Sequence, residues 1–155
     1  MNKKGFTLIE LIAVIVIMAI IALIATPNIV NMVDKANKEE YLANAKEIIS
    51  RASAMEKKGT EKLDKTEDNT FSLKLQDIEG IPNDYKDPYG FIYDKENSKV
   101  VFEYEEKYNQ RTVTILLISK SEEENSKDCY ILKGKSTEIN AERVTKGTIN
   151  DDKCE

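Results

Sequence analysis

One carboxylate lies near the start of a long apolar segment. Glu10 is the only charged residue in the twenty residues from Phe6 to Ala25. At about 1.5 Å per residue, a helix of this length spans roughly 30 Å, the thickness of a bilayer core. A carboxylate within a membrane helix costs free energy, and such residues usually have a partner and a function. Glu10 is either tolerated at the membrane interface or paired in an assembled state, and its surroundings favour the second interpretation.

Two cysteines, Cys129 and Cys154, lie late in the chain and are candidates for one disulfide. The alternative is a pair of free thiols in a reducing compartment. The apolar N-terminal segment indicates delivery across a membrane, which favours the disulfide. The spacing does not suggest a metal site, because the chain has no histidine and no Cys-x-x-Cys sequence.

Other chemistry has little support in this sequence. The absence of histidine excludes histidine-based catalytic triads and histidine metal sites, and there is no glycine-rich nucleotide motif. A net charge of -5 argues against nonspecific binding to nucleic acid. The acidic pairs Asp84/Asp87 and Asp94/Glu96 carry oxygen ligands for calcium, but solvated turn carboxylates are the simpler interpretation. The sequence predicts neither an enzyme nor a cofactor.

The residues before the apolar segment form an export signal with an unusual cleavage position. Lys3 and Lys4 supply its basic region, and no Ala-x-Ala cleavage site follows the apolar segment. The small residue at a plausible cleavage site is Gly5, which precedes the apolar segment. Cleavage there would leave the helix attached to the mature chain. The new amino group, on Phe6, would lie four residues before Glu10.

The segment Lys-Gly-Phe-Thr-Leu-Ile-Glu-Leu, at residues 4–11, resembles the class III signal of type IV pilins and pseudopilins. In that family a membrane-bound prepilin peptidase cuts after the glycine and methylates the new N-terminal phenylalanine. The resemblance implies cleavage between Gly5 and Phe6, and pairing of the Glu10 carboxylate with the Phe6 amine of a neighbouring subunit. Pro27 falls where these proteins carry a helix-kinking proline. Beyond residue 60 only the general layout is similar.

The sequence predicts one long helix with two different halves. Pro27 removes a backbone hydrogen bond and predicts a kink. After it, apolar residues recur at three- and four-residue spacing, from Ile29, Val30 and Val33 to Met55, and this stripe is expected to pack on a globular domain of the same chain. The expected parts are a cleaved leader at residues 1–5 and a transmembrane or filament-core helix at residues 6–28. The amphipathic half of that helix follows at residues 29–58, and a globular region at residues 59–155.

The globular region is expected to contain a small antiparallel sheet. Residues 60–70 are polar and predict a surface loop. β-Branched and aromatic residues predict three strands, at residues 91–93, 99–104 and 112–118. Residues 71–75, which alternate, are a candidate for a short strand before them, and residues 129–132 are a candidate for a fourth strand after them. An antiparallel meander would cover the amphipathic helix, because neither could bury its apolar surface alone. The predicted fold class is α+β: a long N-terminal helix packed on a sheet of three to four strands, as in the pilin fold.

The resemblance implies a structural subunit of a type IV pilus. Such a subunit is a single-pass membrane protein before assembly and part of an extracellular filament afterwards, where it serves adhesion, twitching motility or aggregation. The implied partners are other copies of the chain, minor pilins, prepilin peptidase, the pilus assembly platform and the membrane. A C-terminal disulfide loop is common in this family and supports the pairing of Cys129 with Cys154.

Two alternatives to the pilus subunit remain. One is a pseudopilin of a type II secretion or competence system, and Asp87-Pro88-Tyr89-Gly90 resembles a segment of the major pseudopilins. The other is a signal-anchored, single-pass extracellular binding domain, which would keep its N-terminus uncut.

Overall fold

The computed structural model describes residues 5–67, 69–105, 110–123, 126–150 and 153–155. Within these ranges, five side chains lie outside the described part: those of Ala25, Pro27, Thr66, Glu67 and Lys153. The chain divides into two compact units, Met1–Ala36 and Asn37–Glu155. Its first element is the helix α1, Leu8–Lys57, which continues from the first unit into the second. The helix predicted over residues 6–58 is therefore confirmed. The helix ends with Lys57 in its last turn and with Gly59 just beyond it in a left-handed conformation, with φ of 72°.

From Leu8 on, the first unit is helix, and its large apolar side chains are exposed. Large apolar residues between Phe6 and Val33 are 47% to 94% exposed. Ile29, Val30 and Val33 were expected on the stripe that packs against the globular domain, and that expectation is wrong, because all three are more than half exposed. The buried stripe of α1 starts at Tyr41. The apolar exterior of the first unit therefore extends past Pro27.

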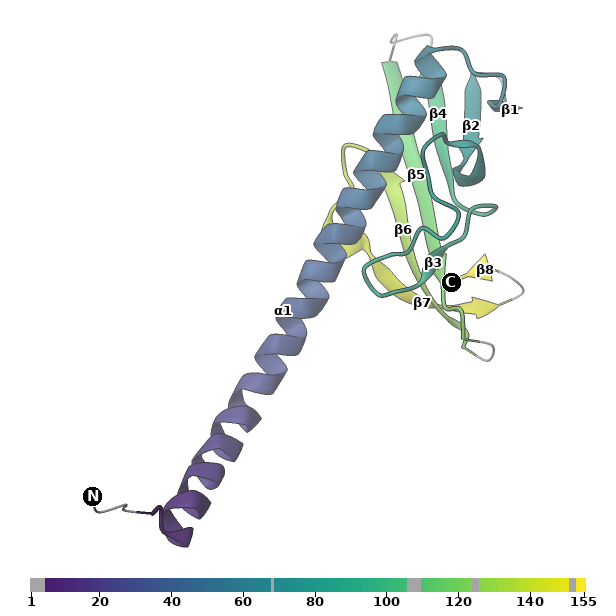
Figure 1. Ribbon diagram of the computed structural model, residues 1–155. Helices are drawn as coiled ribbons and strands as arrows, with labels where there is room; N and C mark the ends of the chain where they lie inside the picture. Colours follow the sequence, from purple (N-terminus) through teal and green to yellow (C-terminus); the bar gives the residue numbers. More distant parts are fainter. Residues whose placement is uncertain (1–4, 68, 106–109, 124–125, 151–152) are drawn as a thin grey trace. The chain divides into compact units, whose positions relative to one another are not determined.

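Within the described residues, the second unit contains eight strands, all paired in antiparallel fashion (Figure 1). The order across the sheet is β1-β2-β4-β5-β6-β7-β8, and β3 pairs with the end of β5. The strands are β1 Asp64–Glu67, β2 Thr70–Lys74, β3 Ile92–Tyr93, β4 Lys99–Glu105, β5 Gln110–Lys120, β6 Asp128–Lys135, β7 Thr145–Asn150 and β8 Lys153–Cys154. Two short 3-10 helices, η1 Leu75–Asp77 and η3 Ala141–Arg143, lie between strands.

The antiparallel meander is confirmed, but the sheet has more strands than the three to four expected. β1 falls in residues 60–70, which were predicted as a loop. β7 and β8 fall in residues 134–155, which are mostly polar and for which no strand was predicted. These strands have polar sequences and lie toward the two edges of the sheet. Their backbones bond to a neighbouring strand, so they do not need the apolar alternation that marks a half-buried strand.

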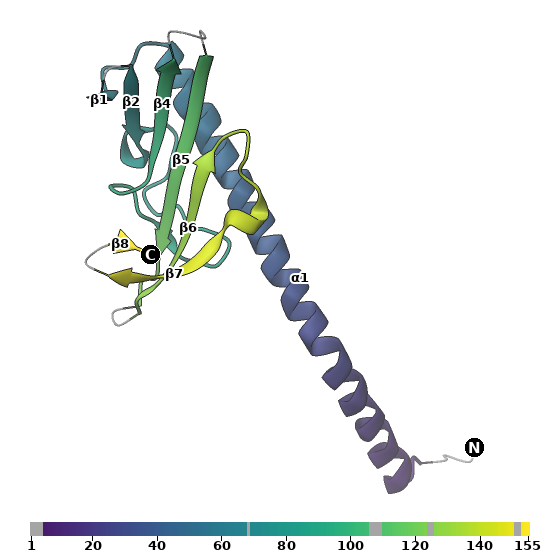
Figure 2. The ribbon, with the colours of Figure 1, turned by 180° about the vertical axis from the view of Figure 1, so that it is seen from behind.

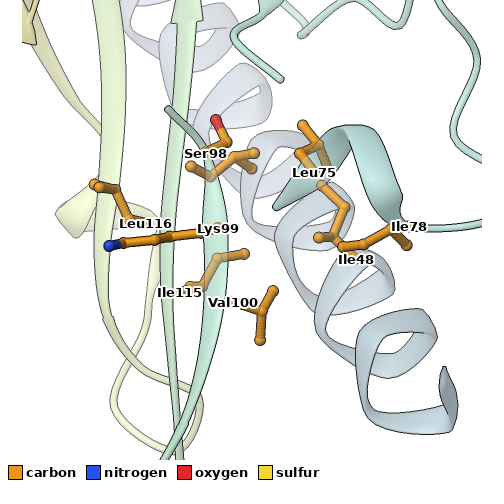
Figure 3. Close-up of a pocket in the computed structure, with 9 residues that line it drawn as sticks. Ile48, Leu75, Ile78, Ser98, Lys99, Val100, Ile115 and Leu116 are labelled. Carbon is orange, nitrogen blue, oxygen red and sulfur yellow. The ribbon is translucent and has the colours of Figure 1, made fainter. Parts of the chain in front are cut away.

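The core lies between the second half of α1 and one face of the sheet (Figures 1 and 2). Its fully buried side chains come from both layers, and they include Tyr41, Ile48, Ala52, Val100, Phe102, Ile115, Leu117 and Leu132. Figure 3 shows Ile48 of α1 facing Leu75 and Ile78 of the segment around η1. The space among these side chains has no room for a water molecule. The buried hydroxyl of Tyr41 donates to the carbonyl of Leu117 at 3.2 Å, as a buried polar group requires.

A disulfide joins Cys129 of β6 to Cys154 of β8, with Cα atoms 6.0 Å apart. This is the pairing that the sequence analysis favoured. The bond closes a loop with a sequence separation of 25 residues. It ties the last strand of the chain to the middle of the sheet.

We predict that the double variant C129S/C154S unfolds more readily by about 3 kcal/mol, because the loop-entropy estimate for a loop of this length has that magnitude. Urea denaturation of the oxidised protein and of the double variant measures the difference. If the two proteins had the same midpoint and slope, the disulfide would contribute nothing to stability.

Candidate functional site

The start of α1 is closed by a reciprocal pair of side chains. Both the backbone N–H and the hydroxyl of Thr7 donate to Oε2 of Glu10, each at 2.8 Å. In return, the backbone N–H of Glu10 donates to Oγ1 of Thr7 at 3.4 Å. This is a capping box, in which Thr7 is the N-cap and Glu10 the third residue of the helix. The arrangement satisfies backbone donors that a helix start leaves unpaired, and it places a negative charge at the positive end of the helix dipole.

The capping box leaves part of the carboxylate available. Both hydrogen bonds to Glu10 use Oε2, and no donor within the described part of the chain reaches Oε1. Glu10 is exposed, as are all its neighbours in the first turn. The carboxylate can therefore accept a cation from another molecule without giving up its role in its own helix.

The predicted processing site lies directly before this cap. Gly5 and Phe6 precede the first residue of α1 and have no regular secondary structure. Phe6 is 94% exposed, and a side chain added at Gly5 would meet nothing within 4 Å. An accessible, irregular backbone is what a peptidase needs. A new amino group on Phe6 would be adjacent to Thr7, whose own N–H is bonded to Glu10.

The remaining predicted assembly residue is Pro27. Its backbone lies within α1, in the short segment between the helix pieces Leu8–Ile24 and Asn28–Lys57. Thr26 donates its hydroxyl to the carbonyl of Ala22 at 2.6 Å, a bond that Ser and Thr often make where helices bend. Among the described residues, no single helix has the length and apolar composition to cross a membrane. The two pieces taken together, as a bent pair, meet these criteria of length and composition.

Sequence reasoning missed Thr7 as a site residue. The signal was present, because Thr-Leu-Ile-Glu at residues 7–10 directly before an apolar run has the spacing of a capping box. The sequence analysis interpreted Glu10 only as a charge that pairs with an amine. The structure assigns it a second role, as an acceptor for its own helix start.

The acidic pairs of the globular region contain both solvated and buried carboxylates. Asp84 and Glu96 are exposed, as expected, but Asp87 is buried, which corrects the expectation for this residue. Asp87 is only 5% exposed, and its carboxylate accepts from the N–H groups of Tyr89 and Phe91, at 2.9 and 2.8 Å, and from the hydroxyl of Ser119. Burial raises the pKa of Asp87, and these hydrogen bonds oppose the rise. Within the described residues no three His, Cys, Asp or Glu side chains gather to hold a metal ion.

The pKa of Asp94 is shifted in the opposite direction from that of Asp87, because its charged and polar partners outweigh the effect of burial. Its Oδ2 lies 2.7 Å from the ammonium group of Lys120 and 2.8 Å from Nδ2 of Asn97, and Oδ1 accepts backbone N–H groups of the same turn. Burial alone would raise the pKa of Asp94, but Lys120 and Asn97 outweigh it and hold the pKa below its ordinary value. The carboxylate therefore fixes the turn between β3 and β4 when it is ionised.

A lowered pKa in the folded state means that Asp94 stabilises the fold above the pKa of the unfolded chain and loses this effect as the pH falls through its folded pKa. We predict that Asp94→Asn lowers the free energy of unfolding near neutral pH by about 1–3 kcal/mol, the range for a lost charge-assisted hydrogen-bond partner. The difference from the unsubstituted protein should begin to shrink as the pH falls below about 4, the ordinary pKa of an aspartic acid, and should disappear only below the lowered pKa of the folded state. Denaturation curves of both proteins across pH measure it, and a difference independent of pH would contradict the assignment.

Comparison with known proteins adds one match. The prokaryotic N-terminal methylation motif matches residues 1–26, and this motif is the class III signal peptide of type IV pilins and pseudopilins. No curated protein and no solved structure matches the chain. The match covers Gly5, Phe6, Thr7 and Glu10, and it points to a structural protein.

Proposed function

We propose that this chain, whose residues 1–26 carry the signal peptide of type IV pilins and pseudopilins, is a structural subunit that polymerises into an extracellular type IV pilus. The observation that carries the proposal is the combination of this signal with a helix whose apolar side chains are exposed from Phe6 to Val33. An apolar surface of this kind needs lipid or other protein around it. A contact repeated head to tail without closure produces a filament.

The proposed sequence of events starts at the membrane. The uncut chain is held there by its apolar helix, and prepilin peptidase cleaves between Gly5 and Phe6 and methylates the new amino group. The assembly platform then moves the helix from lipid into a bundle of identical helices, alone or with minor pilins. The capping box supports this order, because Glu10 has a partner in Thr7 before any neighbouring subunit arrives.

Within the bundle, Oε1 of Glu10 pairs with the Phe6 amine of a neighbouring subunit. Two opposite charges buried together cost much less free energy than either charge buried alone. The pair therefore favours the one axial register in which every carboxylate meets an amine. Pro27 accommodates the bend that packing of the helices requires. On the cell surface the filament serves adhesion, motility or aggregation through the globular units.

Mass spectrometry of the mature protein tests this proposal. We expect a chain that begins at Phe6 and carries one methyl group on its N-terminal nitrogen. A mature chain that retains Met1–Gly5 would exclude filament assembly through Phe6. It would favour a signal-anchored, single-pass binding domain instead.

A pseudopilin is the second candidate, and the segment at residues 87–90 favours it. Asp87 holds this segment in place through Tyr89 and Phe91, and Tyr89 stacks on Tyr130 with ring centroids 3.8 Å apart. A pseudopilin would have the same cleaved and methylated N-terminus. Electron microscopy of intact cells separates the two candidates, because a pilin forms long surface fibres and a pseudopilin a short filament confined to the cell envelope.

A further inference from the structure

The face of the sheet that points away from α1 carries a row of lysines. Lys74, Lys99, Leu116 and Lys133 are direct cross-strand neighbours on β2, β4, β5 and β6. The three lysines are exposed, and none has an ion pair within the described part of the chain. Like charges directly opposite each other destabilise a sheet, so the pair of Lys74 and Lys99 is unfavourable by itself. The row collects unpaired positive charge on a chain whose net charge is -5.

An apolar groove adjoins this row. Its volume is about 410 Å³, and its apolar floor is formed by Leu116, Ile118 and Ile131. Ile118 and Ile131 are direct cross-strand neighbours, two pairs along from Leu116 and Lys133 and therefore on the same face of the sheet. Figure 3 shows Lys99 and Leu116 pointing away from α1, so the groove opens on the outer face of the sheet. Pockets of about 300–1,000 Å³ with an apolar lining and a few polar groups are typical of small-ligand sites.

The groove has a positive and a negative end. Lys133, Ile131 and Cys129 occupy alternate positions of β6 and therefore share one face. Cys129 is bonded to Cys154, which lines the groove together with Glu155. The backbone of Glu155 bonds to Thr148, which is the cross-strand neighbour of Asp128, so the lysine row and Glu155 lie on opposite sides of Ile131.

We propose that this groove binds a small amphiphilic monocarboxylate. Its carboxylate head lies on the lysine row, where it offsets the repulsion between Lys74 and Lys99, and its aliphatic chain covers Leu116, Ile118 and Ile131. Glu155 and Glu96, which also line the groove, disfavour a second negative charge at the other end of the ligand. The site lies wholly in the second unit and does not depend on the proposed filament function.

Lysine footprinting of the full chain in lipid nanodiscs, with octanoate as the probe, tests the site. We expect saturating octanoate to slow acetylation of Lys74, Lys99 and Lys133 by about threefold or more, because a bound ligand removes the free site from the reaction. Lys62, an exposed lysine outside the groove, should react at an unchanged rate. Equal slowing at Lys62, or no slowing at the three lysines, would overturn the proposal.

Three compounds related to octanoate test which chemical groups of the ligand the groove requires. Octanedioate, octyltrimethylammonium and butyrate should each protect the lysines much less than octanoate, since they add a charge near Glu155, reverse the charge of the head, or lack the aliphatic chain. Equal protection by any of the three would contradict the assigned ligand class. These comparisons use the unsubstituted protein, so they do not depend on the folding of a variant.

A matched pair of variants locates the aliphatic chain. Ile131 and Val101 are both half-buried, β-branched residues on the outer face, but only Ile131 lines the groove. Ile131→Thr should abolish protection by octanoate, and Val101→Thr should preserve it. Loss in both variants, or in neither, would contradict binding in the groove.

Discussion

Glu10→Ala subunits are expected to be synthesised, inserted and processed normally but to yield at least about tenfold fewer filaments. Removing one partner of a buried ion pair costs about 3–5 kcal/mol, because the other charge remains buried and unpaired. In the proposed filament this cost recurs at every subunit, as a Phe6 amine without its carboxylate. Quantitative electron microscopy of sheared filaments, alongside immunoblots of membrane-bound subunit, measures the effect. Normal filament yield would contradict the pairing.

The capping box allows the charge of Glu10 to be separated from its hydrogen bonds. Glu10→Gln keeps an acceptor for the N–H and hydroxyl of Thr7, since glutamine also serves in a capping box, but it removes the charge. Thr7→Ala keeps the charge and the bond from the backbone N–H of residue 7, but it removes both bonds of the Thr7 hydroxyl, at a cost of about 0.5–2 kcal/mol for the lost cap. If charge pairing drives assembly, Glu10→Gln should be as defective as Glu10→Ala, and Thr7→Ala should assemble in reduced amounts. Normal assembly of Glu10→Gln would show that the cap alone matters.

Phe102→Ala is expected to destabilise the globular unit by about 3–5 kcal/mol, the usual range for a fully buried aromatic residue. Phe102 lies on β4, is completely buried, and has the guanidinium of Arg111 5.0 Å from its ring centroid. Arg111 in turn pairs with Glu56 of α1 at 2.9 Å. The variant therefore loses apolar burial and disturbs an ion pair between helix and sheet. Urea denaturation followed by near-ultraviolet circular dichroism of the tyrosines measures the loss.

Phe71→Ala is the matched control for this prediction. Phe71 is the direct cross-strand neighbour of Phe102 on β2, but it is only half-buried. Phe71→Ala should lower the free energy of unfolding by about 1–2 kcal/mol, clearly less than Phe102→Ala, because it removes less buried apolar area. Equal costs for the two variants would show that the core is not centred on Phe102.

The long helix and the central strands could be predicted from the sequence because each has its own pattern. The apolar run after Phe6 and the three- and four-residue spacing after Tyr41 specify a helix without knowledge of its neighbours. The β-branched and aromatic residues at 99–104 and 112–118 fall within β4 and β5. These elements bury side chains on at least one face, and burial leaves a periodic signal.

The rest depends on contacts between distant residues, which no local pattern records. β7 has a polar sequence and forms because its backbone bonds to β6. Asp87 looked like a solvated turn residue, but Ser119, 32 positions later in the chain, gives it a buried partner. At the site, the motif at residues 4–11 indicated Gly5, Phe6 and Glu10 directly. The lysine row is invisible in the sequence, because it exists only in the register of four strands.

A density map of purified filaments, resolved to side chains by electron cryomicroscopy, tests the central claim most directly. We expect residues 6–28 of every subunit to lie at the filament axis, with the methylated amine of Phe6 within ion-pair distance of Glu10 in a neighbouring subunit. Filaments whose axis is formed by the globular units, or whose Glu10 carboxylates have no neighbouring amine, would contradict it.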